Sequence, residues 1–239
     1  MRTDTLIVFA RAPRLGTVKR RLARGIGALA ALRFYRGQLR RLLREVGHDR
    51  RWRTVLAVTP DRARWPCGLS ILPRSGVPAP PRSGQAFPPR SSPTFLPQGG
   101  GDLGARMRRA LARHRRAVLI GCDIPDIRRA DIAAAFRALG AADAVFGPAA
   151  DGGYWLVGFG PRRPDAPFAG VRWSTEYALA DTLANFPRHR TALLRRLHDI
   201  DTAADLAALR ARNSVALGAR DQAALRAREP GTPWARDPA

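Results

Sequence analysis

Lysine occurs once in this chain of 239 residues, among 42 basic residues that are otherwise all arginine. This residue, Lys19, follows the apolar run 6–9 and a turn that contains Gly16. We expect a helix to begin near Thr17, so that its unpaired N–H groups and positive dipole end face a ligand above the strand. A phosphate group suits this position, and lysine supplies a compact charge where arginine supplies a planar fork. The segment therefore predicts a phosphate site, with chance placement of one lysine as the alternative.

A carboxylate stands where an expected strand at 118–120 ends. Asp123 follows this strand directly, and ligands of mainly parallel sheets bind at the carboxyl ends of the strands. Asp123 is therefore the best candidate in the chain for a catalytic or metal-binding carboxylate. An aspartate close to a proline also often caps a turn, and the residues alone leave both roles open.

A second acidic cluster lies late in the chain. Asp199 and Asp201 alternate along an extended segment, so their side chains point the same way, as two oxygen ligands of one hard cation would. Thr202 and Asp205 have the spacing of a capped helix start. Both interpretations hold together, because the two carboxylates precede the cap.

A third segment combines an acid, two glycines and two aromatic residues over positions 151–155. The glycines allow the backbone to approach a ligand closely, and Tyr154 and Trp155 could pack on a ring. Core packing is the alternative for both aromatic residues, and we favour it for Trp155.

Extended and helical patterns alternate between these segments, which predicts an α/β fold with a mainly parallel sheet covered on both faces. Asp102 is placed to cap the second helix. Residues 66–98 are rich in proline, serine and glycine, which indicates an exposed insertion loop, with a mobile lid as the alternative. The predicted strands are 6–9, 54–58, 118–120, 144–146 and 154–159, and the predicted helices are 32–46, 103–114 and 131–139.

The formal net charge of +23 raises nucleic acid as a partner. The arginines are spread along the helices without interleaved aromatic residues, and abundant alanine indicates the codon bias of a GC-rich genome, so we do not expect nucleic acid as the main partner. Cys67 and Cys122 are too few for a disulfide framework, and no apolar run approaches membrane-spanning length. We therefore expect a cytoplasmic protein of one domain, with no membrane partner.

Six segments, taken together and in order, resemble an uncharacterised bacterial family of transferases with the GT-A fold. They are Phe9-Ala10-Arg11-Ala12-Pro13…Gly16…Lys19…Arg21-Leu22, Gly101-Asp102-Leu103-Gly104…Arg106-Met107, Ile120-Gly121-Cys122-Asp123-Ile124-Pro125, Gly147-Pro148…Asp151-Gly152-Gly153-Tyr154-Trp155-Leu156-Val157-Gly158, Trp173-Ser174-Thr175 and Asp199-Ile200-Asp201-Thr202. The resemblance covers about residues 5–210. Relatives of this family include 2-phospho-L-lactate guanylyltransferase and molybdenum-cofactor guanylyltransferase, and its members are often labelled glycosyltransferase, or transferase associated with radical-SAM and selenium-domain genes.

This resemblance implies a three-layer GT-A fold, like that of nucleotide-diphospho-sugar transferases, over residues 1–212, followed by a C-terminal helix and tail over 213–239. It also implies Mg²⁺ or Mn²⁺ as cofactor, and Lys19 and Asp123 as catalytic residues. The implied nucleotide-binding residues are Ala10, Arg11, Gly16, Lys19, Arg21, Gly101, Asp102, Gly104 and Asp123. The implied metal ligands are Asp123 and Asp201 with Asp199 as helper, and the implied acceptor-binding residues are Asp151, Gly152, Tyr154, Trp173 and Ser174.

Three departures from the family pattern leave these candidates in place. Arg20 stands where the family usually has threonine, Ala203-Ala204 stands where it has a Pro-Glu pair, and the proline-rich stretch before Gly99 is longer than is usual. The leading expectation is nucleotidyl transfer from a nucleoside triphosphate to a small phosphorylated acceptor, with release of pyrophosphate. The alternatives are glycosyl transfer from a nucleotide-sugar and, from another class, a non-catalytic nucleotide- or RNA-binding module.

Overall fold

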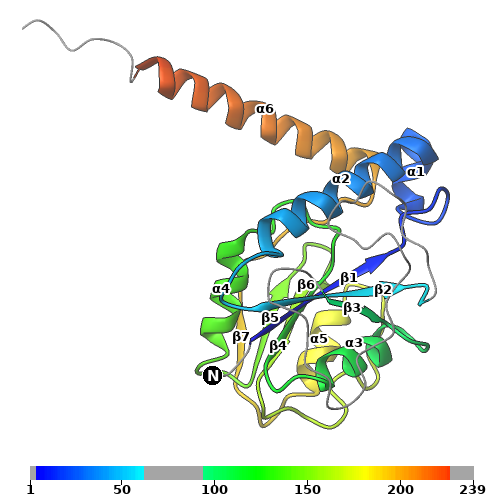
Figure 1. Cartoon of the computed structure of the whole chain (residues 1–239), viewed down its shortest axis with the longest axis vertical. Helices are drawn as coiled ribbons and strands as arrows, with labels where there is room; N and C mark the ends of the chain where they lie inside the picture. Colours follow the sequence, from blue (N-terminus) through cyan, green and yellow to red (C-terminus); the bar gives the residue numbers. More distant parts are fainter. Residues whose placement is uncertain (1–3, 62–93, 227–239) are drawn as a thin grey trace, which may run out of the picture.

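The computed structural model describes residues 4–61 and 94–226 as a mainly parallel sheet between two layers of helices (Figure 1). Within these ranges the sheet has seven strands in the order β3-β2-β1-β4-β6-β5-β7. Strand β6 runs antiparallel to β4 and β5, and the other pairs are parallel. The expected α/β fold class is thereby confirmed. The strands are β1 (Thr5–Arg11), β2 (Arg53–Thr59), β3 (Thr94–Pro97), β4 (Ala117–Ile120), β5 (Ala144–Pro148), β6 (Tyr154–Phe159) and β7 (Thr191–Leu193).

Helices cover both faces of this sheet. Helices α2 and α4 lie on one face, α3 and α5 on the other, while α1 and the start of α6 lie beyond the end of β1 (Figure 1). The rest of α6 extends away from the body of the protein. The helices are α1 (Arg20–Ile26), α2 (Ala28–Val46), α3 (Leu103–Ala112), α4 (Arg129–Ala138), α5 (Ala178–Ala184) and α6 (Ala203–Arg226).

The hydrophobic pattern explains this layering. Leu6 and Val8 of β1 face a core formed with α2 and α4, whereas Ile7 faces a second core formed with α3 and α5. A central strand of a parallel sheet is buried on both sides, so its sequence is a continuous apolar run instead of an alternating one. Helix α2 carries its apolar residues at helical spacing on one face, among them Leu39 and Leu43, which are fully buried.

The predicted strands and helices all exist, with several corrections to predicted ranges. Residues 94–97, placed in the insertion loop 66–98, form β3, because Thr94-Phe95-Leu96 pair with the buried edge of β2. Residues 66–93 of that predicted loop lie outside the described residues. The helix predicted over 103–114 ends at Ala112, so His114 follows it. The predicted domain boundary at residue 212 falls within α6, and the domain division stays a prediction.

The helix expected to begin near Thr17 begins instead at Arg20. Lys19, the residue before it, has left-handed backbone angles of φ 47° and ψ 49°. A non-glycine residue in this region costs roughly 1–2 kcal/mol and cannot continue a right-handed helix, so the helix can start only after it. The lysine therefore caps α1 instead of lying within its first turn.

Among the helices of the described ranges, none combines the length and the apolar character that crossing a membrane requires.

Candidate functional site

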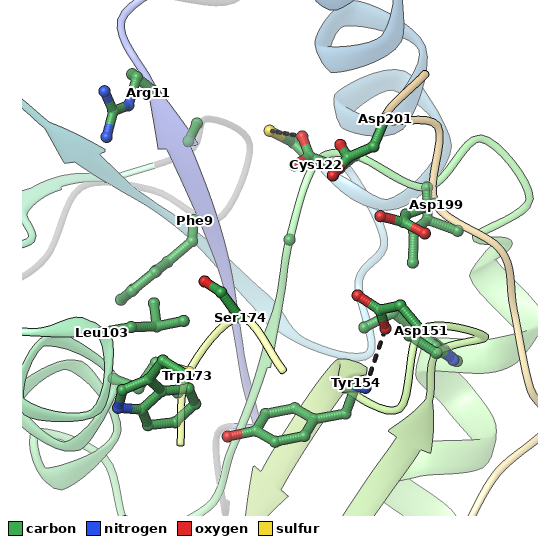
Figure 2. A pocket seen from close by; sticks show the side chains of 18 of the residues that line it. Phe9, Arg11, Leu103, Cys122, Asp151, Tyr154, Trp173, Ser174, Asp199 and Asp201 are labelled. Carbon is green, nitrogen blue, oxygen red and sulfur yellow. Dashed lines mark hydrogen bonds between the residues drawn. The ribbon is translucent and has the colours of Figure 1, made fainter. Parts of the chain in front are cut away.

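A cleft of about 840 Å³ opens at the carboxyl ends of β1 and β4. Acidic side chains line one side of it and aromatic side chains the other, as Figure 2 shows for Asp199 and Asp201 against Phe9 and Trp173. The two strands are neighbours and parallel, so the residues that follow them necessarily meet at the same edge of the sheet. The site predicted from the sequence is therefore brought together in one cavity.

Most of the predicted site residues line this cleft. These are Ala10, Arg11, Lys19, Arg21, Asp123, Asp151, Tyr154, Trp173, Ser174, Asp199 and Asp201. The predicted residues that are not among those lining it are Gly16, Gly101, Asp102, Gly104 and Gly152. For three of these positions, Asp102, Gly104 and Gly152, the structure shows a local structural reason for the residue type.

Asp102 caps α3, as predicted, because its Oδ1 accepts a 2.8 Å hydrogen bond from the N–H of Ala105. Gly104 lies in the first turn of this helix, where an added Cβ would come within 2.8 Å of the Trp173 ring. Both residues thus have structural roles, and their predicted contacts with base or ribose stay predictions.

The turn between β5 and β6 is held against the segment before α5. Gly152 has a φ of +84°, and a Cβ there would collide with the backbone of Glu176. The carbonyl of Gly152 also accepts a hydrogen bond from the N–H of Leu179. Asp151 accepts one at 3.0 Å from the N–H of Gly153, which fixes the carboxylate at the rim of the cleft. Ser174, on the facing segment, has a positive φ of 62°.

Lys19 lies at the centre of the acidic side of the cleft. Its Nζ is 2.8 Å from Oδ1 of Asp201 and 3.3 Å from Oδ2 of Asp123. The lysine side chain is only 4% exposed, whereas the two carboxylates are 38% and 49% exposed. Burial by itself would lower the pKa of Lys19, but the two carboxylates outweigh it, so the pKa is raised and the ammonium stays charged.

The third predicted metal ligand lies beside this group without joining it. Burial raises the pKa of Asp199, and the neighbouring carboxylates of Asp201 and Asp151 raise it further. Within the described residues no three acidic, histidine or cysteine side chains converge closely enough to hold a metal ion by themselves. Asp123 and Asp201 do converge on one point, the lysine Nζ. Two carboxylates with open space beside them fit Mg²⁺, which takes one or two carboxylates and completes its shell with substrate phosphates and water.

The segment before α6 has the predicted cap. Oδ2 of Asp205 accepts hydrogen bonds from the N–H groups of Asp201 and Thr202, and Thr202 accepts one from the N–H of Asp205. This reciprocal cap fixes the backbone of Asp201 and so aims its side chain at the cleft. The two interpretations of the segment, carboxylate ligand and helix cap, are therefore compatible in the structure.

Arginines add positive charge at the mouth of the cleft. Arg11, Arg20 and Arg21 line it, and Arg21 is exposed, with Nη1 3.9 Å from Oδ2 of Asp201. At this distance and exposure the pair contributes little to stability, which leaves the guanidinium available to an anion.

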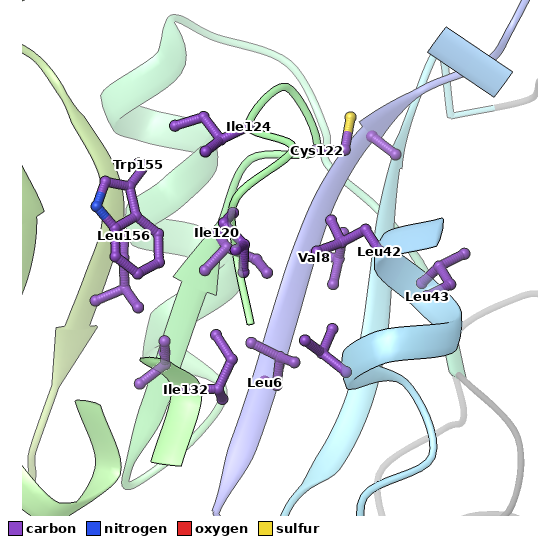
Figure 3. Close-up of a cluster of buried hydrophobic side chains, with 14 of the residues drawn as sticks. Leu6, Val8, Leu42, Leu43, Ile120, Cys122, Ile124, Ile132, Trp155 and Leu156 are labelled. Carbon is purple, nitrogen blue, oxygen red and sulfur yellow. The ribbon is translucent and has the colours of Figure 1, made fainter. Parts of the chain in front are cut away.

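Tyr35 is a site residue that the sequence analysis did not identify. Its hydroxyl accepts a 2.8 Å hydrogen bond from the N–H of Arg11 and donates a 2.9 Å bond to the carbonyl of the same residue. The thiol of Cys122 lies 3.3 Å from this oxygen, at the end of the core cluster beyond Val8 and Ile120 (Figure 3). The tyrosine thus connects α2 to the end of β1 and to the segment after β4. Its spacing on α2 is that of a core residue, so no signal in the sequence could distinguish it.

The glycine-rich segment after β3 is held by two arginines of α3. Arg109 donates to the carbonyls of Gln98 and Gly100, and Arg106 donates to that of Gly101. Gln98, which is buried, donates in turn to the carbonyls of Ala10 and Ala57. This loop is therefore fixed to the ends of β1 and β2 before any ligand binds.

The sheet order and this cleft define an α/β protein with the fold of nucleotide-diphospho-sugar transferases. The chain belongs to the family described as "Uncharacterized protein conserved in bacteria (DUF2064)", whose model matches residues 42–175. No curated protein matches it.

The first two of the following three solved structures support the fold. A proposed nucleotide-diphospho-sugar transferase from Desulfovibrio desulfuricans G20 is 29% identical, with a TM-score of 0.69 over 87% of each chain. A 4-diphosphocytidyl-2C-methyl-D-erythritol synthase from Anaerococcus prevotii is 10% identical, with a TM-score of 0.51 over 89% of this chain and 99% of that one. The protein Rv0371c from Mycobacterium tuberculosis, solved with manganese, is 17% identical, with a TM-score of 0.43 over 87% and 97%. The relation to the two guanylyltransferases stays a prediction.

Proposed function

We propose that the protein is a metal-dependent nucleotidyltransferase that acts on a nucleoside triphosphate and a small phosphorylated acceptor. The observation that carries this proposal is the convergence of Lys19, Asp123 and Asp201 at the carboxyl ends of β1 and β4. A surface that only binds phosphate has no need of carboxylates beside it unless a metal ion intervenes.

In the proposed reaction an oxygen of the acceptor phosphate attacks the α-phosphorus, and the bond between the α- and β-phosphates breaks. Lys19, Arg11 and Arg21 would offset the charge that develops on the departing pyrophosphate. Asp123 and Asp201 would hold Mg²⁺ or Mn²⁺, which supplies Lewis-acid polarisation of the phosphoryl oxygens. Asp151 and Tyr154, which also line the cleft, would orient the acceptor.

A second candidate is glycosyl transfer from a nucleotide-sugar. It is favoured by the name of the Desulfovibrio protein, the 29% identical structure. In that reaction the leaving group is a nucleoside diphosphate, and Asp151 at the rim of the cleft would act as general base.

The first experiment separates these candidates by ligand. Each of the four common nucleoside triphosphates and several nucleotide-sugars is added with Mg²⁺ or Mn²⁺, and the melting temperature is measured. A ligand at 100 times its dissociation constant stabilises by about 2.7 kcal/mol, and for a protein of this size that raises the melting temperature by roughly 5–10 °C. A shift with a triphosphate and none with nucleotide-sugars supports nucleotidyl transfer, and the reverse result supports glycosyl transfer.

The second experiment tests the residues. Asp123→Ala and Asp201→Ala should each abolish the metal-dependent shift, whereas Asp165→Ala, at an exposed aspartate outside the cleft, should keep it. Lys19→Ala should slow pyrophosphate release with the best triphosphate from the screen. If both carboxylate variants keep metal-dependent binding, the metal assignment is wrong. If Lys19→Ala releases pyrophosphate as fast as the wild type, the role of Lys19 toward the departing pyrophosphate is wrong.

A further inference from the structure

Lys19 occupies the position that the proposed metal ion needs. Its Nζ lies 2.8 Å and 3.3 Å from the carboxylate oxygens of Asp201 and Asp123, the two groups that converge there. An ammonium ion and a divalent cation repel one another, and two carboxylate oxygens cannot bind both closely at the same time. In this structure the internal cation therefore competes with the external one.

The same lysine is the cation expected to bind the phosphates of the nucleotide. With a 4% exposed side chain and two of its three N–H donors directed at carboxylates, Lys19 has little left for a triphosphate in the cleft unless it leaves them. The two proposed roles of Lys19 thus require two positions of its side chain. In the second position the Lys19 ammonium would contact the phosphates of the nucleotide, whose negative charge replaces that of the two carboxylates.

We propose that Lys19 is an exchangeable internal cation, which pairs with Asp123 and Asp201 until the divalent ion and the nucleotide phosphates bind together. The phosphates draw Lys19 away from Asp123 and Asp201 as the metal ion takes its place, so neither ligand alone gains the full interaction. Metal and nucleotide then bind with positive coupling, and the metal ion alone binds weakly. This inference rests on the proposed metal and nucleotide sites, and it adds the coupling between them.

The backbone of Lys19 is consistent with exchange. It is one of two non-glycine residues with positive φ in the described ranges, and both, Lys19 and Ser174, line the cleft. A residue in this conformation is held by its surroundings, and here these include the two ion pairs and the hydrogen bond from the N–H of Ala23 to the Lys19 carbonyl. When the side chain leaves the carboxylates, the part of this restraint that the ion pairs supply is removed.

The deciding experiment measures Mn²⁺ binding without nucleotide, by the loss of the electron paramagnetic resonance signal of the free ion. Lys19→Met keeps the apolar stem and removes the charge, so it should bind Mn²⁺ at least tenfold more tightly than the wild type. The matched control is Arg21→Met. It removes a guanidinium charge 3.9 Å from Asp201, and this charge does not lie at the point between Asp123 and Asp201 that the metal ion needs. An exposed pair of this kind is worth up to about 1 kcal/mol, so Arg21→Met should change the affinity for Mn²⁺ by less than about fivefold. Equal or weaker binding by Lys19→Met, or an equal gain in the control, overturns the proposal.

A second measurement needs no variant and so remains available if Lys19→Met fails to fold. Because the chain has a single lysine, wild-type protein labelled with ¹³C at the lysine ε carbon gives one side-chain signal of this kind. Mg²⁺ alone should move this signal only as the weak metal site fills, and Mg²⁺ with tripolyphosphate should move it at lower metal concentration. A signal that stays in place when the metal site is saturated shows that Lys19 need not leave, and overturns the proposal.

Failure of this inference can be told from failure of the proposed function. If Lys19→Met gains Mn²⁺ affinity but the wild type releases no pyrophosphate with any triphosphate, the exchange stands and nucleotidyl transfer is wrong. If the wild type releases pyrophosphate but Lys19→Met gains no affinity, the exchange is wrong and the reaction stands.

Discussion

Replacing Tyr35 by phenylalanine should destabilise the protein more than its loss of one oxygen atom suggests. The Tyr35 hydroxyl makes two hydrogen bonds to the backbone of Arg11, at 2.8 Å and 2.9 Å. Each such bond is worth about 1 kcal/mol net, and phenylalanine leaves both backbone groups without this partner. We therefore expect a loss of about 2 kcal/mol in the free energy of unfolding, which corresponds to roughly 4–8 °C in melting temperature for a protein of this size.

Tyr154→Phe is the matched control. Tyr154 is also a tyrosine that lines the cleft, but its hydroxyl is 3.4 Å from that of Thr182, which keeps its 2.7 Å bond to the carbonyl of Ala178. No backbone group loses a partner in this variant, so we expect a loss below about 1 kcal/mol. Both variants are measured by thermal and urea unfolding. If Tyr35→Phe loses no more stability than Tyr154→Phe, the hydroxyl does not hold the end of β1 in the way described.

Three further predictions concern other parts of the molecule. Burial and neighbouring arginines lower the pKa of His114 to about 4. As the pH falls from 6.5 to 4, this histidine is therefore protonated in the unfolded state before it is protonated in the folded state. Wild-type stability should fall by up to roughly 3 kcal/mol over this range, and urea unfolding of His114→Gln should show a smaller fall. Gly104→Ala, which brings a Cβ to 2.8 Å from the Trp173 ring, should cost about 1–3 kcal/mol and alter the tryptophan fluorescence, whereas Gly100→Ala, with open space around it, should do neither. Binding of a labelled DNA duplex, followed by fluorescence anisotropy, should be weak and fall steeply with salt; tight, sequence-selective binding at physiological salt would instead support a nucleic-acid-binding module.

The meeting of the candidate residues in one cleft could be predicted from the sequence because it depends on topology. Lys19 and Asp123 each follow an apolar run, and parallel strands bring the residues after them to one edge of the sheet. The order of motifs then added Asp201, which lies far along the chain. What the sequence could not give was the partner of the lysine, because contacts between distant segments depend on side-chain positions that no local pattern encodes.

Two other differences have local causes. Helix α5 has seven residues and β7 has three, both too short for a periodic pattern to emerge, so neither was predicted. Lys19 follows a glycine-containing turn, a context that gives no sign of burial. Its side chain is nevertheless only 4% exposed, and it pairs with Asp123 and Asp201 from two distant segments.

The contact between Lys19 and Asp201 joins residues that are 182 positions apart. During synthesis at about 5–20 residues per second, the lysine would leave the ribosome roughly 10–40 s before its partner. The first four strands of the chain, with their flanking helices, can form within that time, while the acidic wall of the cleft is still incomplete. A nascent or C-terminally truncated chain that ends before Asp201 would therefore have much of the sheet and no competent cleft, so binding of a metal–nucleotide complex would report on completion of the chain.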